Sequence, residues 1–142
     1  MSAIALVLTA CSGEQEAPAA QAELSVVAEL AGFQSQVANG ADLFATNCAA
    51  CHGANLEGTT LGPILAGNTF MQRWGSGSPT SLLNSIQANM PPGGSAALGE
   101  EEYLALTAHV LAENGMDSVS EALTTSTDLV IADNVSAVVA RR

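Results

Sequence analysis

The chain has 142 residues, room for a single domain, and carries a formal net charge of −11, because 14 acidic residues face only three basic ones. This balance argues against nucleic acid as a partner and against electrostatic binding to anionic lipid, since both need clustered Lys and Arg. It favours partners that present a basic patch. Hydrophobic residues make up 48% of the sequence and are mostly Ala, Leu and Val. Such a composition suits packed helices better than a β-sandwich, so we predict an all-α fold.

The N-terminus is a short apolar run over residues 3–10 that ends at Cys11. The run is too short to span a bilayer as a helix, which needs about 20 residues, but it matches the apolar core of a secretory signal. Its end, Leu8-Thr9-Ala10-Cys11, resembles a bacterial lipobox. This resemblance implies that Cys11 carries a lipid and that Ser12 favours sorting to the outer membrane. No Lys or Arg precedes the run, so the alternatives are a start upstream and a loosely ordered N-terminus with a stray cysteine.

Residues 12–23 contain no aromatic or β-branched residue and no apolar period, which predicts a flexible linker. The chain is thus expected to have four parts. These are a signal-like segment over residues 1–10, the lipid-anchor cysteine and linker over 11–30, a core domain over 31–115 and a C-terminal extension over 116–142. The apolar run Leu129-Val130-Ile131 is expected either to pack back onto the domain or to form an arm that docks a partner.

The most informative stretch of the sequence is Cys48-Ala49-Ala50-Cys51-His52. Two thiols three positions apart on one turn can reach the two vinyl groups of a haem and form thioethers, and the adjacent histidine then points at the iron. A structural zinc site would need four ligands, and beyond this motif the only other Cys and His residues are Cys11 and His109. A thioredoxin-like dithiol would need a preceding strand, which the pattern does not indicate. The motif therefore predicts one covalently attached haem c.

With this motif the sequence resembles class I cytochromes c, from about residue 30 to residue 115. Gly40 and Phe44 precede Cys48 by eight and four residues, which is the family spacing for an N-terminal helix that crosses the C-terminal helix. The resemblance implies a cytochrome c fold, with about three to four core helices around one covalently attached haem.

A second matching segment is Leu61-Gly62-Pro63-Ile64-Leu65-Ala66-Gly67, which corresponds to Gly-Pro-x-Leu-x-Gly in the family. The resemblance implies that the carbonyl of Pro63 accepts a hydrogen bond from the proximal His52, which fixes its tautomer and strengthens it as a ligand. It also implies that Leu65 lines the haem pocket.

The sixth iron ligand is expected from Asn89-Met90-Pro91-Pro92-Gly93-Gly94, which resembles the distal methionine loop. The loop follows a helix predicted over residues 79–88, with Ser78 as N-cap and Pro79 at the first position. Two prolines end this helix and stiffen the loop, so we expect Met90 to face the iron. The other methionines are less suitably placed: Met1 in the signal-like segment, Met71 before an Arg-Trp pair and Met116 after the last core helix.

The last core helix is predicted over residues 100–114, with three glutamates in its first turn and Gly115 as its stop. His109 stands where the family usually has an aromatic residue at the helix crossing. We expect His109 to be half-buried and neutral. The alternatives are a redox-linked proton site and, with less support, a second histidine ligand to the iron.

Iron with His52 and Met90 bound has no open position, so the resemblance implies a single-electron carrier rather than an enzyme, with a potential above that of a bis-histidine site. Arg73 or Trp74 is a candidate to hydrogen-bond a haem propionate, although Trp74 is equally a packing candidate. One alternative is a haem sensor or peroxidase-like enzyme in which Met90 is labile. Another is a metal or dithiol protein without haem.

Segments around Phe70, Trp74, Met90 and Tyr103 resemble a narrower group, the cytochrome c domains found with PQQ-dependent alcohol dehydrogenases. This implies transfer from a quinoprotein dehydrogenase, in which the chain could act as the cytochrome subunit, into a periplasmic or membrane-surface respiratory chain. We expect redox protein partners with a basic docking patch. We expect no nucleic acid partner, and contact with the membrane only through the Cys11 anchor.

Overall fold

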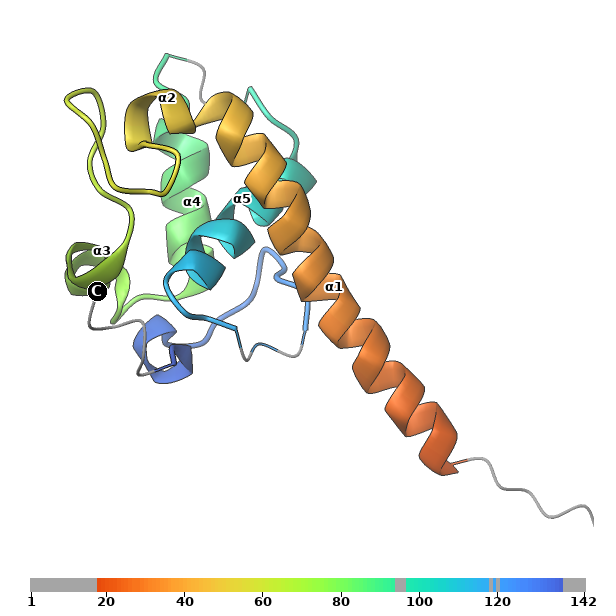
Figure 1. The fold of residues 1–142 in the computed structure, drawn as a ribbon. Helices are drawn as coiled ribbons and strands as arrows, with labels where there is room; N and C mark the ends of the chain where they lie inside the picture. Colours follow the sequence, from red (N-terminus) through yellow and green to blue (C-terminus); the bar gives the residue numbers. More distant parts are fainter. Residues whose placement is uncertain (1–17, 94–96, 118, 120, 137–142) are drawn as a thin grey trace, which may run out of the picture.

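The computed structural model describes residues 18–93, 97–117, 119 and 121–136, with side chains from residue 32 onward. The signal-like segment 1–10, Cys11 and the first part of the predicted linker lie outside the described residues. The described chain is helical and contains no strand, which confirms the all-α fold class (Figure 1). Its elements are α1 (Pro18–Asn47), α2 (Ala49–His52), α3 (Gly67–Trp74), α4 (Pro79–Asn89), α5 (Glu100–Glu113) and the 3-10 helix η1 (Ile131–Asn134).

Helix α1 begins at Pro18, where the sequence predicted a flexible linker up to Glu23. The difference has a local cause, because Pro suits the first helical turn and the Ala, Gln, Glu and Leu residues that follow are good helix formers. The first turns of α1 extend beyond the rest of the folded chain (Figure 1). Within the described residues, the search for a helix of sufficient length and hydropathy to cross a membrane finds none.

The core is organised around the crossing of α1 and α5 (Figure 1). Gly40 permits the close approach of these helices, because a Cβ atom there would overlap the main-chain carbonyl of Ala105 and lie 2.8 Å from Cβ of His109. Phe44 fills the crossing one turn later and is only 2% exposed. Helix α5 is buried at every residue from 103 to 111, so the rest of the domain surrounds it along this length.

The ends of the predicted helices follow from local chemistry. Helix α4 ends at Asn89, one residue after the prediction, and α5 ends at Glu113, one residue before it. Ser78 caps α4 as predicted, since its side chain accepts a hydrogen bond from the Ser81 N–H. Gly115 follows α5 with a φ of 89°, a left-handed conformation that suits glycine. Helix α3 has no counterpart in the prediction, because its eight residues are too few to indicate a helix by periodicity.

The described part of the C-terminal extension packs back onto the domain. Leu123 and Ile131 are 2% and 0% exposed. The side-chain amide of Gln36 donates to the carbonyl of Leu123 at 2.9 Å and accepts from its N–H at 2.7 Å. The N–H of Ile131 donates to the carbonyl of Gly77 at 3.0 Å. The extension therefore ties α1 to the segment between α3 and α4, as in the first of the two expected arrangements.

Candidate haem site

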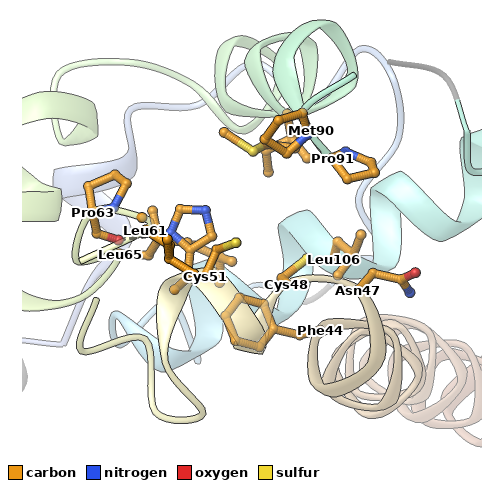
Figure 2. A pocket seen from close by; sticks show the side chains of 15 residues that line it. Phe44, Asn47, Cys48, Cys51, Leu61, Pro63, Leu65, Met90, Pro91 and Leu106 are labelled. Atoms are coloured by element: carbon orange, nitrogen blue, oxygen red, sulfur yellow. Dashed lines mark hydrogen bonds between the residues drawn. The ribbon is translucent and has the colours of Figure 1, made fainter. Parts of the chain in front are cut away.

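Two adjoining cavities lie between the Cys48–His52 turn and the end of α4, and Figure 2 shows the smaller one. Their volumes are about 110 and 690 Å³, and the larger one is of a size that holds organic cofactors. Every residue predicted to bind haem lines at least one of them. The two cavities adjoin and are together called the slot; they share six lining residues: His52, Pro63, Leu65, Ile86, Met90 and Val110.

The two cysteines of the motif lie on the wall of the smaller cavity. Helix α1 ends at Asn47, and the short helix α2 then turns the chain through main-chain bonds from Cys51 and His52 to the carbonyl of Cys48. Both thiols are free and half-buried. Burial, and secondarily the neighbouring Cys51, raises the pKa of the Cys48 thiol. The turn thus presents two free thiols on one side of the slot.

His52 is buried, 6% exposed, and lines both cavities. Its Nδ1 atom lies 2.8 Å from the main-chain carbonyl oxygen of Pro63. A carbonyl oxygen can only accept, so we assign the proton to Nδ1, which leaves the lone pair on Nε2. The hydrogen bond implied by the family resemblance is therefore present, and Nε2 is the atom available to a metal.

The loop that carries Pro63 and Leu65 is held in place by Asn114, a residue that the sequence did not indicate. Asn114 is 1% exposed, and its Nδ2 donates to the carbonyl of Leu65 at 2.9 Å. Its Oδ1 accepts from the N–H of Gly67 at 2.9 Å. These contacts span almost 50 residues of sequence, and no local pattern predicts them.

Met90 lies across the smaller cavity from Cys48 and Cys51 (Figure 2). It is the C-cap residue of α4, where the backbone becomes extended, and its N–H still donates to the carbonyl of Ile86 at 2.8 Å. Of the other methionines in the described residues, Met71 packs against the core and Met116 is 0% exposed. Neither of them lines the slot. The arrangement therefore singles out Met90 as the thioether opposite the Cys48–His52 turn.

The far end of the slot is more polar. Arg73 and Trp74 line only the larger cavity, whereas the cysteines line only the smaller one. The guanidinium carbon of Arg73 lies 5.4 Å from the centroid of the Trp74 ring, a cation–π distance. Within the described residues, Arg73 is the one Lys or Arg side chain. The slot thus has thiols at one end and a cation at the other.

His109 lies at the helix crossing and does not line either cavity. It is 8% exposed, and so more buried than expected. Its Nδ1 atom is buried without a hydrogen-bond partner in the structure. Burial lowers the pKa of His109 below its usual value, and the nearby Glu113 opposes this shift. This position does not support His109 as an iron ligand.

The residues of the slot fit a covalently held haem c. It offers two free thiols, an imidazole with a fixed tautomer, a thioether on the opposite side and largely apolar walls. A zinc site fits poorly, since no three His, Cys, Asp or Glu side chains of the described chain lie close enough together to hold a metal ion.

A helical domain with these groups around one slot is a class I c-type cytochrome. Residues 35–110, more than half of the chain, match the family model for cytochrome c oxidase, cbb3-type, subunit III, and the chain belongs to this family of cytochrome c domains. A search of solved structures finds no match. The family match does not test the association with PQQ-dependent alcohol dehydrogenases, which stays a prediction.

Proposed function

We propose that this chain carries single electrons by means of one haem c, attached through Cys48 and Cys51, with His52 and Met90 as axial ligands. A cytochrome c domain is a domain of haem-based electron transfer, so the proposal adds the ligand set and the setting. The observation that carries it is the position of Met90 across the slot from the Cys48–His52 turn (Figure 2). Both axial groups then come from the chain itself.

The side chains around the slot have distinct tasks in this proposal. A bound haem c would supply the one-electron iron couple. The Pro63 carbonyl would keep the proton of His52 on Nδ1 and so leave Nε2 as the atom to hold the iron. The thioether of Met90 favours the reduced state relative to a second histidine. Phe44, Leu65 and other apolar side chains exclude water from the slot.

Occupation of both axial positions leaves no site for a substrate or for oxygen, which is why we propose a carrier and not an enzyme. The alternative is a haem sensor or peroxidase-like enzyme, which requires that Met90 leave the iron readily. The two functions differ in how strongly Met90 would bind the iron. The binding of carbon monoxide to the reduced protein can separate them.

At the larger cavity, we assign Arg73 and Trp74 to the propionate groups. Arg73 is the available cation, and its stacking on Trp74 holds the guanidinium beside the cavity. Thiols at one end and a cation at the other would orient a haem with its vinyl edge towards Cys48 and Cys51 and its carboxylates towards α3.

The proposed setting is a respiratory chain on the periplasmic side of a bacterial envelope. The family description, which names an oxidase subunit, agrees with a respiratory role. The net charge of −11 favours redox partners with a basic docking patch. From the sequence we further expect that Cys11 carries a lipid and that the protein lies at the outer membrane. We also expect that a quinoprotein dehydrogenase is its electron donor.

The test is the absorption spectrum of protein matured in a host with a c-type haem assembly system. We expect haem that stays with the chain on denaturation and, in the oxidised state, the near-infrared sulfur-to-iron charge-transfer band. Met90→Ala should lose this band. Met71→Ala is the matched control, since Met71 does not line the slot, and should keep it. A wild type without the band would favour the sensor or enzyme, and a chain without covalent haem would overturn the proposal.

A further inference from the structure

We infer that Tyr103 is a positioning residue for the Met90 ligand, which it holds by a hydrogen bond to the main chain. The inference rests on the proposed His52 and Met90 ligation. The phenol Oη of Tyr103 donates to the main-chain carbonyl oxygen of Met90 at 3.0 Å. This contact joins the first turn of α5 to Met90, the C-cap residue of α4.

The main chain of Met90 is thereby held on both sides. Its N–H donates to Ile86 in the last turn of α4, and its carbonyl accepts from Tyr103. The next two residues, Pro91 and Pro92, have no N–H and so cannot donate main-chain hydrogen bonds. The hydrogen bond from Tyr103 links the start of this loop to a second helix, α5.

Tyr103 is well suited to be this anchor because its own position is rigid. The side chain is 2% exposed and belongs to the hydrophobic core. The start of α5 is fixed by the Glu102 carboxylate, which accepts from the N–H of Gly99 at 2.7 Å. The N–H of Tyr103 also donates to the carbonyl of Gly99 at 3.1 Å. A movement that takes the main chain of Met90 away from the slot must therefore break this hydrogen bond or move α5.

The test is the rate at which carbon monoxide binds to the reduced holoprotein, since carbon monoxide can bind only when Met90 has left the iron. Tyr103→Phe keeps the ring and removes the donor. We expect it to speed carbon monoxide binding about fivefold, the effect of losing one hydrogen bond from the ligated state. Thr107→Val is the matched control: it removes a buried hydroxyl one turn later in α5, one that donates to the Tyr103 carbonyl and not to the ligand loop. It should bind at the wild-type rate.

A second measurement uses the fact that Tyr103 is the only tyrosine of the chain. Growth on 3-fluorotyrosine changes this residue alone and makes the phenol a stronger donor, so it should slow carbon monoxide binding. An effect opposite in sign to that of Tyr103→Phe is not expected from a loss of packing. The 3-fluorotyrosine measurement also tests the role of the Tyr103 hydroxyl if the Tyr103→Phe variant does not fold.

The outcomes separate the inference from the function on which it rests. A wild type that lacks the charge-transfer band overturns the Met90 ligation itself. A wild type with the band, together with equal rates in Tyr103→Phe and wild type, overturns only the inference. If carbon monoxide binding becomes equally faster in Tyr103→Phe and Thr107→Val, the inference is also overturned, because the faster binding would then come from a general loosening of α5.

Discussion

The imidazole of His109 packs against the ring of Phe44, with ring centroids 5.3 Å apart and planes inclined by 53°. Phe44 also lines the haem slot, so His109 is separated from the slot by one aromatic ring. The Nδ1 atom of His109 has no partner in this setting, and burial lowers the pKa of the ring. The neutral imidazole is therefore the form that the folded protein accommodates.

The free energy of unfolding should decrease at acidic pH because His109 is buried in its neutral form. The unfolded chain binds a proton at His109 near its usual pKa of about 6.5, whereas the folded chain does so only at lower pH. Stability is therefore complete above about pH 7.5, falls as the pH drops through 6.5, and levels off below the folded pKa. In denaturant titrations, His109→Phe should lose less stability than wild type between about pH 7.5 and 5.5.

His109→Phe should also be about 1 kcal/mol more stable than wild type at pH near 7.5, because it removes a buried nitrogen without a partner. His52, the only other histidine, is common to both proteins, so the difference between them isolates His109. Parallel pH profiles for the two proteins would show that His109 is not the group responsible.

Gly40→Ala should lower the free energy of unfolding by about 2 kcal/mol, since the added methyl must push α1 away from Ala105. Gly32→Ala is the control in the same helix, because its Cβ would overlap no main-chain atom and its nearest neighbour would be Cβ of Ala122 at 3.2 Å. The gain in helix propensity should make it nearly neutral. Chemical denaturation measures both, and equal stability of the two variants would contradict the close crossing.

Asn114→Ala should cost about 2 to 3 kcal/mol, because it leaves the carbonyl of Leu65 and the N–H of Gly67 without their partner. Hydrogen exchange of the Gly67 amide should become faster as the loop loosens. The control is Asn134→Ala, which removes one exposed hydrogen bond to the carbonyl of Val130 and should change stability by less than about 0.5 kcal/mol. An Asn114 variant as stable as this control would show that Asn114 does not hold the loop of Leu65 and Gly67 in place.

Arg73→Gln should lower the reduction potential of the holoprotein, because a lost positive charge beside the slot favours the more positive, oxidised iron. Arg73 is exposed and screened, so we expect a change of about 0.5 to 1 kcal/mol, or roughly 20 to 45 mV for a one-electron couple. Arg73→Lys keeps the charge and should stay near the wild-type potential in protein-film voltammetry. An unchanged potential in the glutamine variant would place the guanidinium away from the haem carboxylates.

Features that depend on neighbouring residues were predictable from the sequence. The Ser78 cap, the Gly115 stop and the Cys48–His52 turn are each specified within a few positions. The Gly40 and Phe44 spacing indicated the helix crossing through the resemblance to class I cytochromes c, which share that spacing. The start of α1 at Pro18 was missed because a sequence without apolar periodicity can still form a helix from good helix formers.

Contacts between distant segments were not predictable. Asn114 and Leu65 are 49 residues apart, and the polar side chain gives no local sign of what it will bind. The residues around Tyr103 give no sign of what its hydroxyl binds, and only the packed structure brings it to Met90. The burial of His109 depends on how closely α1 approaches α5, which a single helix pattern does not determine.

The pair of hydrogen bonds between Gln36 and Leu123 also limits how early α1 can be fixed while the chain is being synthesised. It joins residues 87 positions apart, so a chain that emerges N-terminus first cannot close it until Leu123 has been made. The Cys48–His52 motif is complete long before that point. Cys48, Cys51 and His52 are therefore available before the segment around Leu123 can fasten α1 to the core.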